Sequence, residues 1–189
     1  MSQDARTRLL ELFRTRAFAV GKFRLASGKE SSYYVNSKKI LFNGEAVSLL
    51  AEVLYDLTRE LDLQAIGGPE VGAIPIAAAL AMRYYQAGRV VEGFFIRKQA
   101  KTHGSQELVE GLLRPGDRVA VVEDVVTTGE SVLKAIQEVE RAGGQVVAVT
   151  CLVDRLEGGR ERLTPRYHYL PVFTIRDFGI EPPESHPET

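Results

Sequence analysis

One uninterrupted apolar run limits the folds open to this chain. Val119 to Val122 are four consecutive apolar residues, a pattern typical of a strand buried on both faces of a parallel sheet. From Val132 the apolar residues recur at helical spacing until Gly143 and Gly144 end the pattern. Residues 118–144 therefore predict a strand, a short loop and a helix, the repeating unit of an α/β fold with a mainly parallel sheet.

The loop between this strand and this helix has the composition of a phosphate-binding turn. Its sequence is EDVVTTGES, from Glu123 to Ser131. Backbone N–H groups at a helix start lack helical partners, Gly129 lets an anion approach closely, and the hydroxyls add donors. Two acids would repel a phosphate, so we expect them to bind sugar hydroxyls or to steady a bound Mg²⁺. A capping role alone would explain one acid or one Thr, which favours a ligand site.

Two further segments follow predicted strands and could meet the same ligand. A short strand from Ala65 leads into a loop with glycines at 67, 68 and 72, although a tight turn that needs glycine for packing would look the same. The strand ending at Ile96 leads into RKQAKTHG, which suggests a mobile loop over 98–111. Ligands bind at the carboxyl ends of parallel strands, so we expect these loops to form one site.

The remaining segments complete the predicted α/β order. We expect an amphipathic helix over 4–16, short strands joined by tight turns over 18–40, and a helix capped by Asn43. A strand over 145–153 ends at Asp154 and Arg155, and on residue type alone Arg155 would be an ion-pair partner of Asp154. The Pro-rich acidic tail, 181–189, is expected to be disordered. The core face of the capped helix is predicted to contain Val47, Leu50, Leu54, Leu57 and Leu61.

Composition excludes several classes of protein. At 189 residues the chain suits a single domain, and a net charge of −1 gives no overall basic field for nucleic acid or a membrane surface. The single cysteine, Cys151, excludes an internal disulfide and fits a reducing compartment; its apolar neighbours predict a buried thiol. No apolar run approaches membrane-spanning length and the first residues are charged, so we expect a cytoplasmic protein.

Three motifs resemble those of a known enzyme family. VVEDVVTTGES resembles the 5-phosphoribosyl diphosphate (PRPP) binding motif of the type I phosphoribosyltransferases. The pattern F-x-L-x-S-G-x-x-S-x-Y-x-x-N, from Phe23 to Asn36, and R-K-x-x-K-x-H-G, from Arg97, resemble the hood and the catalytic loop of the orotate branch. The resemblance implies one type I phosphoribosyltransferase domain over 1–189 with an N-terminal hood over about 18–40. It also implies transfer of the phosphoribosyl group from PRPP to orotate, with release of pyrophosphate, in pyrimidine biosynthesis.

The resemblance also implies roles for individual residues. Lys101, His103 and Asp124 would be catalytic, and Tyr34, Thr127 and Arg155 would bind orotate. Mg²⁺ would be held mainly by PRPP and water without direct protein ligands, and the enzyme would be a homodimer whose Lys101 and His103 reach the partner's site. The pyrophosphate loop would comprise Gly68, Pro69, Glu70, Val71 and Gly72. The residues that would bind PRPP are Arg97, Lys98, Lys101, His103, Glu123, Asp124, Val125, Val126, Thr127, Thr128, Gly129, Glu130 and Ser131.

Two departures from the family pattern and two rival interpretations accompany this assignment. Some members have Lys where this chain has Ala26 and Gly72, so those lysine contacts are not expected here. The chain could instead be a phosphoribosyltransferase for another base, but a base without a carboxylate would leave Arg155 unpaired. It could also be a PRPP-sensing regulator with the same fold, but the near-neutral chain has no spare length for a nucleic-acid-binding module.

Overall fold

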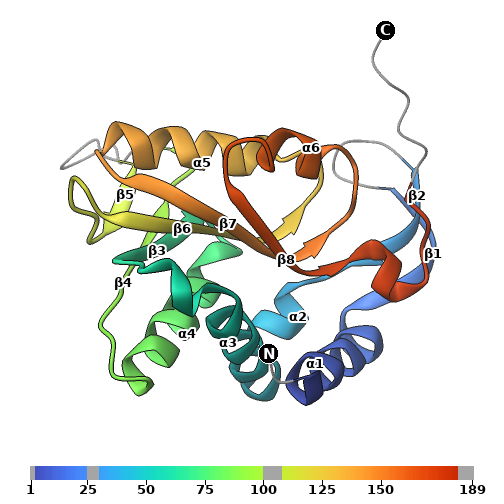
Figure 1. The fold of residues 1–189 in the computed structure, drawn as a ribbon. Coiled ribbons are helices and arrows are strands. Elements are labelled where there is room, and N and C mark those ends of the chain that lie inside the picture. The colour runs from blue at the N-terminus through green and yellow to red at the C-terminus, as the bar shows by residue number, and fades with distance from the viewer. Residues whose placement is uncertain (1–2, 25–29, 100–107, 183–189) are drawn as a thin grey trace, which may run out of the picture.

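A six-stranded sheet forms the centre of the protein in the computed structural model, which describes residues 3–24, 30–99 and 108–182. The strand order is β5-β4-β3-β6-β7-β8 (Figure 1). All neighbours are parallel except β5, which pairs antiparallel with β4. The strands are β3 (Ala65–Pro69), β4 (Glu92–Ile96), β5 (Val109–Gly111), β6 (Arg118–Val126), β7 (Gln145–Asp154) and β8 (His168–Thr174). The α/β class with a mainly parallel sheet is confirmed.

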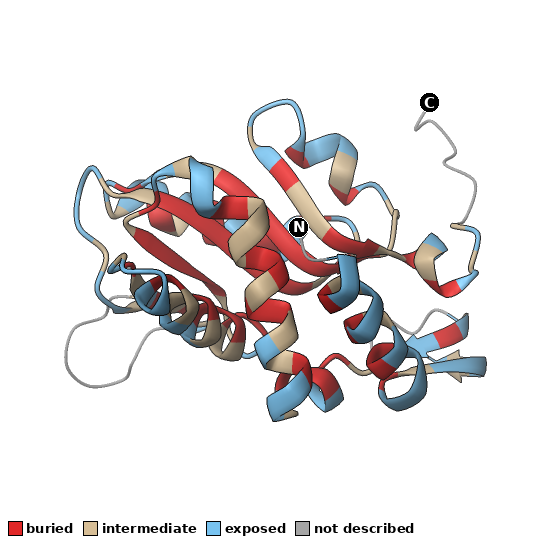
Figure 2. Cartoon of the chain, turned by 60° about the horizontal axis from the view of Figure 1, so that its bottom comes forward, coloured by how far each residue is buried: buried red, intermediate tan, exposed pale blue. Residues whose placement is uncertain are grey.

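Helices cover both faces of this sheet, as parallel strands buried on both sides require. In Figure 1, α5 (Glu130–Arg141) and α6 (Gly159–Leu163) lie on one face. The other face carries α1 (Gln3–Arg16), α3 (Gly44–Thr58) and α4 (Ala73–Gln86). Short 3₁₀ turns, η1 (Arg59–Leu61) and η2 (Ile175–Phe178), follow α3 and β8. Two apolar clusters fill the two interfaces, and Figure 2 shows buried residues along the strands and on the inner sides of the helices.

The buried face of α5 is the one that the apolar periodicity predicts, whereas the buried face of α3 differs from the predicted one. In α5 the predicted face is confirmed, because Val132, Ile136 and Val139 are buried. In α3, Asn43 caps the helix by accepting a hydrogen bond from the Ala46 N–H at 3.0 Å. Its predicted core face was only partly right: Leu50 and Leu54 are buried, with Ala46 and Val53 beside them. Val47 and Leu57 of α3 and Leu61 of η1 are only partly buried, because α3 packs between α1 and α4 and its buried face also contains Ala46, Ala51 and Val53.

The N-terminal hood comprises β1 (Phe18–Arg24), β2 (Glu30–Val35) and the short helix α2 (Lys38–Leu41). The strands pair antiparallel, Phe18 opposite Val35, which confirms the predicted strands. The Phe18 ring stacks on Tyr33 and on Phe178, with centroids 6.0 and 5.0 Å apart. These aromatic contacts fix the base of the hood against the end of the main sheet.

The topology opens a crevice between β3 and β6. From β3 the strand order runs outward through β4, whereas from β6 it runs the opposite way through β7 and β8. β3 pairs with β6 only as far as Gly67 opposite Val121, while β6 continues beside β7 to Val126. The pairing of the two strands therefore stops before their carboxyl ends, the position where open α/β sheets bind ligands.

Some predictions concern residues outside the described ranges. Lys101, His103, Ala26 and all but the start of the tail over 181–189 are among them. The predicted loop over 98–111 differs at its end, because Val109–Gly111 form β5 by pairing with the exposed edge of β4. Within the described residues, no helix is both long and apolar enough to span a bilayer.

Candidate active site

A cleft of about 860 Å³ lies at the carboxyl ends of β3, β4 and β6. It brings together the three loops that sequence reasoning placed at one site. From the predicted PRPP-binding set it is lined by Arg97, Lys98, Glu123, Asp124, Val125, Thr127, Thr128, Glu130 and Ser131. From the predicted pyrophosphate loop it is lined by Pro69, Glu70, Val71 and Gly72. Val126 is buried in the core beneath and does not line the cleft, and its carbonyl oxygen accepts a hydrogen bond from the Arg155 N–H at 2.9 Å.

Glu123 is held rigidly at the inner wall of this cleft. Its side chain accepts hydrogen bonds from the Asp124 N–H at 3.0 Å and from the Ser131 hydroxyl at 3.2 Å. Glu123 is only 7% exposed. Burial, together with the neighbouring Asp124 carboxylate, raises the pKa of Glu123 well above its ordinary value of 4.5. This carboxyl group therefore resists ionisation and can offer sugar hydroxyls a neutral partner.

Asp124 carries the charge of the acidic pair. Burial would raise its pKa, but hydrogen bonds with Glu123, Lys38 and Ser37 outweigh burial and lower the pKa below 3.8. The Ser37 hydroxyl and the Lys38 ammonium both donate to Oδ2 of Asp124, and the Val125 N–H donates to Oδ1 at 3.0 Å. The hood thus fixes an ionised carboxylate at the centre of the cleft.

The turn between β6 and α5 has the backbone geometry expected of an anion site. Gly129 has φ +77°, a left-handed conformation that a side chain would strain, and it packs against Gly159. The turn leads directly into the first turn of α5, whose N–H groups have no helical partners. Thr127, Thr128 and Ser131 bring their hydroxyl groups to the cleft wall. The arrangement can bind a phosphate through backbone and hydroxyl donors.

The loop between β3 and α4 packs closely against β6. A Cβ at Gly68 would lie 2.0 Å from the Val122 carbonyl oxygen, and a Cβ at Gly72 would lie 2.4 Å from the Asp124 carboxylate. Both positions therefore require glycine for close approach. Glu70 accepts a hydrogen bond from the Lys98 N–H at 2.8 Å, which ties this loop to the start of the basic segment.

Arg155 lies at the end of β7 with its guanidinium group held in place. Its Nε donates to the Tyr33 hydroxyl at 2.8 Å, its Nη2 lies 2.8 Å from Glu157, and the group stacks 4.8 Å above the Tyr33 ring. The predicted ion pair with Asp154 is absent among the described contacts; Asp154 instead faces Arg160 at 3.5 Å. Nη1 of Arg155 has no partner within the described part of the chain, so this edge of the fork could pair with a carboxylate. The side chain is only 12% exposed, however, and Arg155 is not among the residues that line the cleft.

Comparison with known proteins identifies the family. The family described as "Phosphoribosyl transferase domain" matches residues 37–186. Orotate phosphoribosyltransferase of Bradyrhizobium diazoefficiens is 43% identical over 166 residues, covering 85% of this chain and 89% of that protein. The enzyme of Streptomyces avermitilis is 45% identical over 160 residues, covering 85% and 88%.

The chain belongs to the orotate phosphoribosyltransferase family. Solved structures agree with this assignment. The orotate phosphoribosyltransferase of Mycobacterium tuberculosis, crystallised with Fe(III) dicitrate, superimposes with a TM-score of 0.83 at 37% identity, covering 93% of this chain and 99% of that one. The same enzyme in complex with PRPP gives a TM-score of 0.78 at 34% identity, with the same two coverages.

The two adjacent tyrosines in the hood of this orotate phosphoribosyltransferase family member have different surroundings. Tyr34, the predicted orotate-binding residue, is 45% exposed and its ring lies 5.5 Å from that of Phe23. Tyr33 is the residue that contacts Arg155. Alternation along β2 explains the difference, since adjacent residues of a strand point to opposite faces. Whether Tyr34 also contacts the base stays a prediction.

Sequence reasoning on this phosphoribosyltransferase missed four residues that the fold brings to the site. Ser37 and Lys38 reach Asp124, while Tyr33 and Glu157 hold Arg155. Ser37 is buried, which is uncommon for a serine next to two lysines, but nothing in the sequence marks it as buried. Tyr33 is itself the tyrosine of the hood motif, whereas the signal for Ser37 and Lys38 was proximity to that motif, which ends at Asn36.

Proposed function

We propose that this protein catalyses transfer of the 5-phosphoribosyl group from PRPP to orotate, giving orotidine 5′-monophosphate and pyrophosphate. The bond between C1 of ribose and the pyrophosphate oxygen breaks, a bond from C1 to a ring nitrogen of orotate forms, and that nitrogen loses its proton. One observation carries the proposal. In a member of this family, one cleft is lined by the turn between β6 and α5, by the acidic pair Glu123 and Asp124, and by the glycine loop before α4.

Each wall of the cleft suits one part of this reaction. The turn from Thr127 to Ser131 would bind the 5-phosphate, and the loop from Gly68 to Gly72 would bind the pyrophosphate. Positive charge develops on the ribose ring as the pyrophosphate leaves. The ionised carboxylate of Asp124 would stabilise that charge, while Glu123, whose raised pKa disfavours ionisation, would bind a hydroxyl with less repulsion toward the phosphates.

The leaving group requires cations. Arg97 and Lys98 line the cleft, and Lys101 and His103 continue the same basic segment. They would neutralise charge as it builds on pyrophosphate, and His103 could donate a proton to it. Arg155 would bind the orotate carboxylate through its available edge, with Thr127 and Tyr34 as further orotate contacts.

Mg²⁺ is the cofactor that this reaction implies. The residues present fit an ion held mainly by substrate and water, because Glu123 and Asp124 offer hard oxygen donors at the cleft but their oxygens already accept hydrogen bonds from protein groups. No cluster of three or more potential ligands occurs within the described ranges. When bound, Mg²⁺ would neutralise phosphate oxygens of PRPP.

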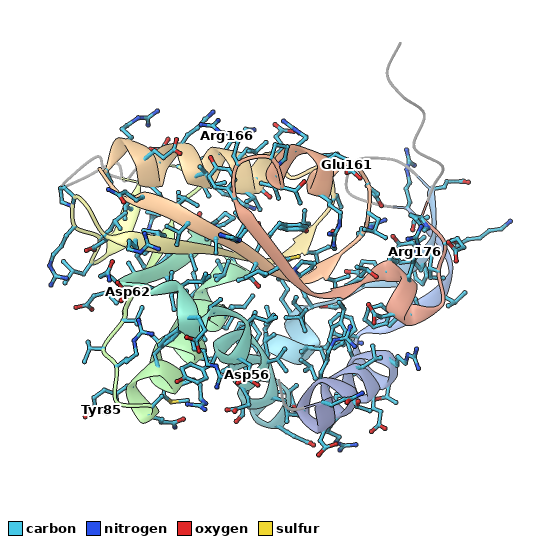
Figure 3. The ribbon with its side chains drawn as sticks, in the orientation of Figure 1. Asp56, Asp62, Tyr85, Glu161, Arg166 and Arg176 are labelled. Atoms are coloured by element: carbon cyan, nitrogen blue, oxygen red, sulfur yellow. The ribbon has the colours of Figure 1, made fainter. Side chains whose placement is uncertain are left out.

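We also propose that the chain acts in the cytoplasm as one domain and as a homodimer. The single cysteine supports a reducing compartment. Met82, Tyr85 and Val90, large apolar residues near the end of α4, are 55%, 71% and 76% exposed, which supports burial by a second copy; Figure 3 labels Tyr85 at the surface. Mixing Lys101→Ala with Asp124→Asn tests shared sites: the two inactive variants should together regain up to about a quarter of wild-type turnover.

The decisive test of function is an assay of the purified protein with Mg²⁺ and PRPP against orotate, uracil and the purine bases. We expect pyrophosphate release with orotate alone. Lys101→Ala should lower kcat by about 100-fold or more while circular dichroism stays unchanged. Turnover of a base without a carboxylate at a rate equal to that of orotate would contradict the assignment, and PRPP binding without any turnover would favour a regulator.

A further inference from the structure

Among the described cations that line the cleft, Lys38 is the one that contacts the acidic pair, Glu123 and Asp124. Its Nζ is 2.5 Å from Oδ2 of Asp124. The Asp124 side chain is 10% exposed, but that of Lys38 is 51% exposed and lines the cleft. Lys38 therefore reaches from the hood to the acidic pair while about half of its side chain stays exposed in the cleft.

The other described cations of the cleft are engaged elsewhere or make no described contact with the acids. Lys134 pairs with Glu130 at 2.6 Å, and Arg97 lies 3.9 Å from Glu110. Lys98 follows β4, and its backbone is bound to Glu70. None of these three has a described contact with Asp124.

The opposite wall of the cleft lacks a cation of its own. The loop from Gly68 to Gly72 contains one charged residue, Glu70, and that charge is negative. Gly72 cannot be replaced in place by a longer side chain, since a Cβ there would lie 2.4 Å from the Asp124 carboxylate. A pyrophosphate bound at this loop would meet backbone donors and a carboxylate, so it needs positive charge from another element.

We propose that Lys38 binds the pyrophosphate group of PRPP and thereby serves in place of a cation in the glycine loop. This inference rests on the proposed function. In the free protein Lys38 pairs with Asp124. An ammonium group has three donors, so when ribose hydroxyls share Asp124, Lys38 can keep one hydrogen bond to that carboxylate and direct the others to pyrophosphate oxygens.

If Lys38 has this role, it should also strengthen the binding of the product, inorganic pyrophosphate. Inorganic pyrophosphate lacks the ribose that Asp124 would hold, so an effect of Lys38 on its binding does not pass through the ribose. A lysine that only positioned Asp124 would affect PRPP through the ribose and leave pyrophosphate affinity unchanged.

The experiment compares Lys38→Ala and Lys38→Arg with a matched control, Lys39→Ala. Lys39 is the next residue, is exposed, and has no described ion-pair or hydrogen-bond partner through its side chain. Binding of Mg²⁺-pyrophosphate and of PRPP is measured by calorimetry on the full-length protein, together with kcat and the KM for orotate. Circular dichroism establishes that each variant is folded.

We expect Lys38→Ala to weaken Mg²⁺-pyrophosphate and PRPP binding by about tenfold each, with the orotate KM within about twofold of wild type. Lys38→Arg should restore part of the affinity, and Lys39→Ala should match wild type. Equal pyrophosphate affinities for Lys38→Ala and wild type, or no binding by wild type, would overturn the assignment. Wild-type protein that binds pyrophosphate but does not convert orotate would overturn the proposed function and leave this assignment standing.

Discussion

Gly72 lies directly against Asp124, so that a Cβ at position 72 would come within 2.4 Å of the carboxylate. Asp124 cannot easily move aside, because Ser37, Lys38 and the Val125 N–H hold both of its oxygens. We predict that Gly72→Ala displaces the carboxylate and lowers kcat/KM for PRPP by about 10- to 100-fold, as displacement of a catalytic group by about 1 Å typically does. Steady-state kinetics measures this loss.

The matched control for that substitution is Gly44→Ala. Gly44 is the first residue of α3, and nothing lies within 4 Å of the Cβ that it would gain. This variant should keep wild-type kinetics and should not be less stable. If Gly72→Ala also kept wild-type kinetics, the position of the Asp124 carboxylate would not matter for catalysis.

Tyr33 should tune orotate binding through Arg155. The Tyr33 hydroxyl accepts a hydrogen bond from Nε of Arg155 at 2.8 Å, and its ring lies under the guanidinium group. Tyr33→Phe keeps the ring but removes the acceptor, so we predict a rise of about three- to tenfold in the orotate KM with little change in the PRPP KM. The initial-rate dependence on each substrate separates the two constants.

Arg155→Lys tests the proposed contact with the orotate carboxylate more directly than Tyr33→Phe does. Lysine keeps the charge but cannot pair with a carboxylate through two parallel hydrogen bonds. We expect this variant to lose more orotate affinity than Tyr33→Phe. Equal effects of either substitution on both substrates would show that Arg155 supports the whole site rather than the base.

The strand, turn and helix around Glu123 to Ser131 could be predicted from sequence because their determinants are local. A buried strand needs consecutive apolar residues, and a left-handed turn favours glycine, as at Gly129. The contact between Lys38 and Asp124 joins residues 86 positions apart. Nothing local encodes such a contact, because it depends on how the hood packs on the sheet.

Sequence alone also could not predict which of Tyr33 and Tyr34 contacts Arg155. Two adjacent tyrosines in a strand point to opposite faces, and the register of β2 on β1, with Tyr33 opposite Val20, decides which one faces Arg155. The apolar residues of α3 are distributed so that more than one side of the helix could face the core. Packing against α1 and α4 selected the one that buries Ala46 and Val53.

Neutralising the two acids should have opposite effects on stability. The pKa of Glu123 is raised in the folded protein, so its favourable contribution is complete below about pH 4.5 and is lost as the pH rises through the folded pKa. Glu123→Gln should therefore raise Tm at pH 8 relative to wild type, and by more than at pH 5. Scanning calorimetry across this pH range measures the difference.

Asp124→Asn should change Tm in the other direction. The pKa of Asp124 is lowered, so its contribution is complete above about pH 3.8 and is lost only as the pH falls through the folded pKa. The Asn variant should be less stable than wild type at neutral pH, because Lys38 loses its ionic partner. A Tm gain for both variants would mean that the acids merely repel one another.

Cys151 should be chemically silent in the native enzyme. The thiol is buried in β7 opposite Glu123 of β6, and burial raises its pKa. Only the thiolate reacts readily with disulfide reagents, so we predict that 5,5′-dithiobis(2-nitrobenzoate) at pH 8 modifies the native protein at least about 100-fold more slowly than the denatured chain. The absorbance of the released 2-nitro-5-thiobenzoate measures both rates.

The denatured chain provides the reference for this measurement, because it should release one thiol equivalent from its single cysteine. Turnover should be unchanged after native incubation with the reagent. Rapid native labelling with loss of turnover would contradict this burial, since the thiol packs in the apolar cluster with α5 and lies 3.3 Å from the Tyr169 hydroxyl.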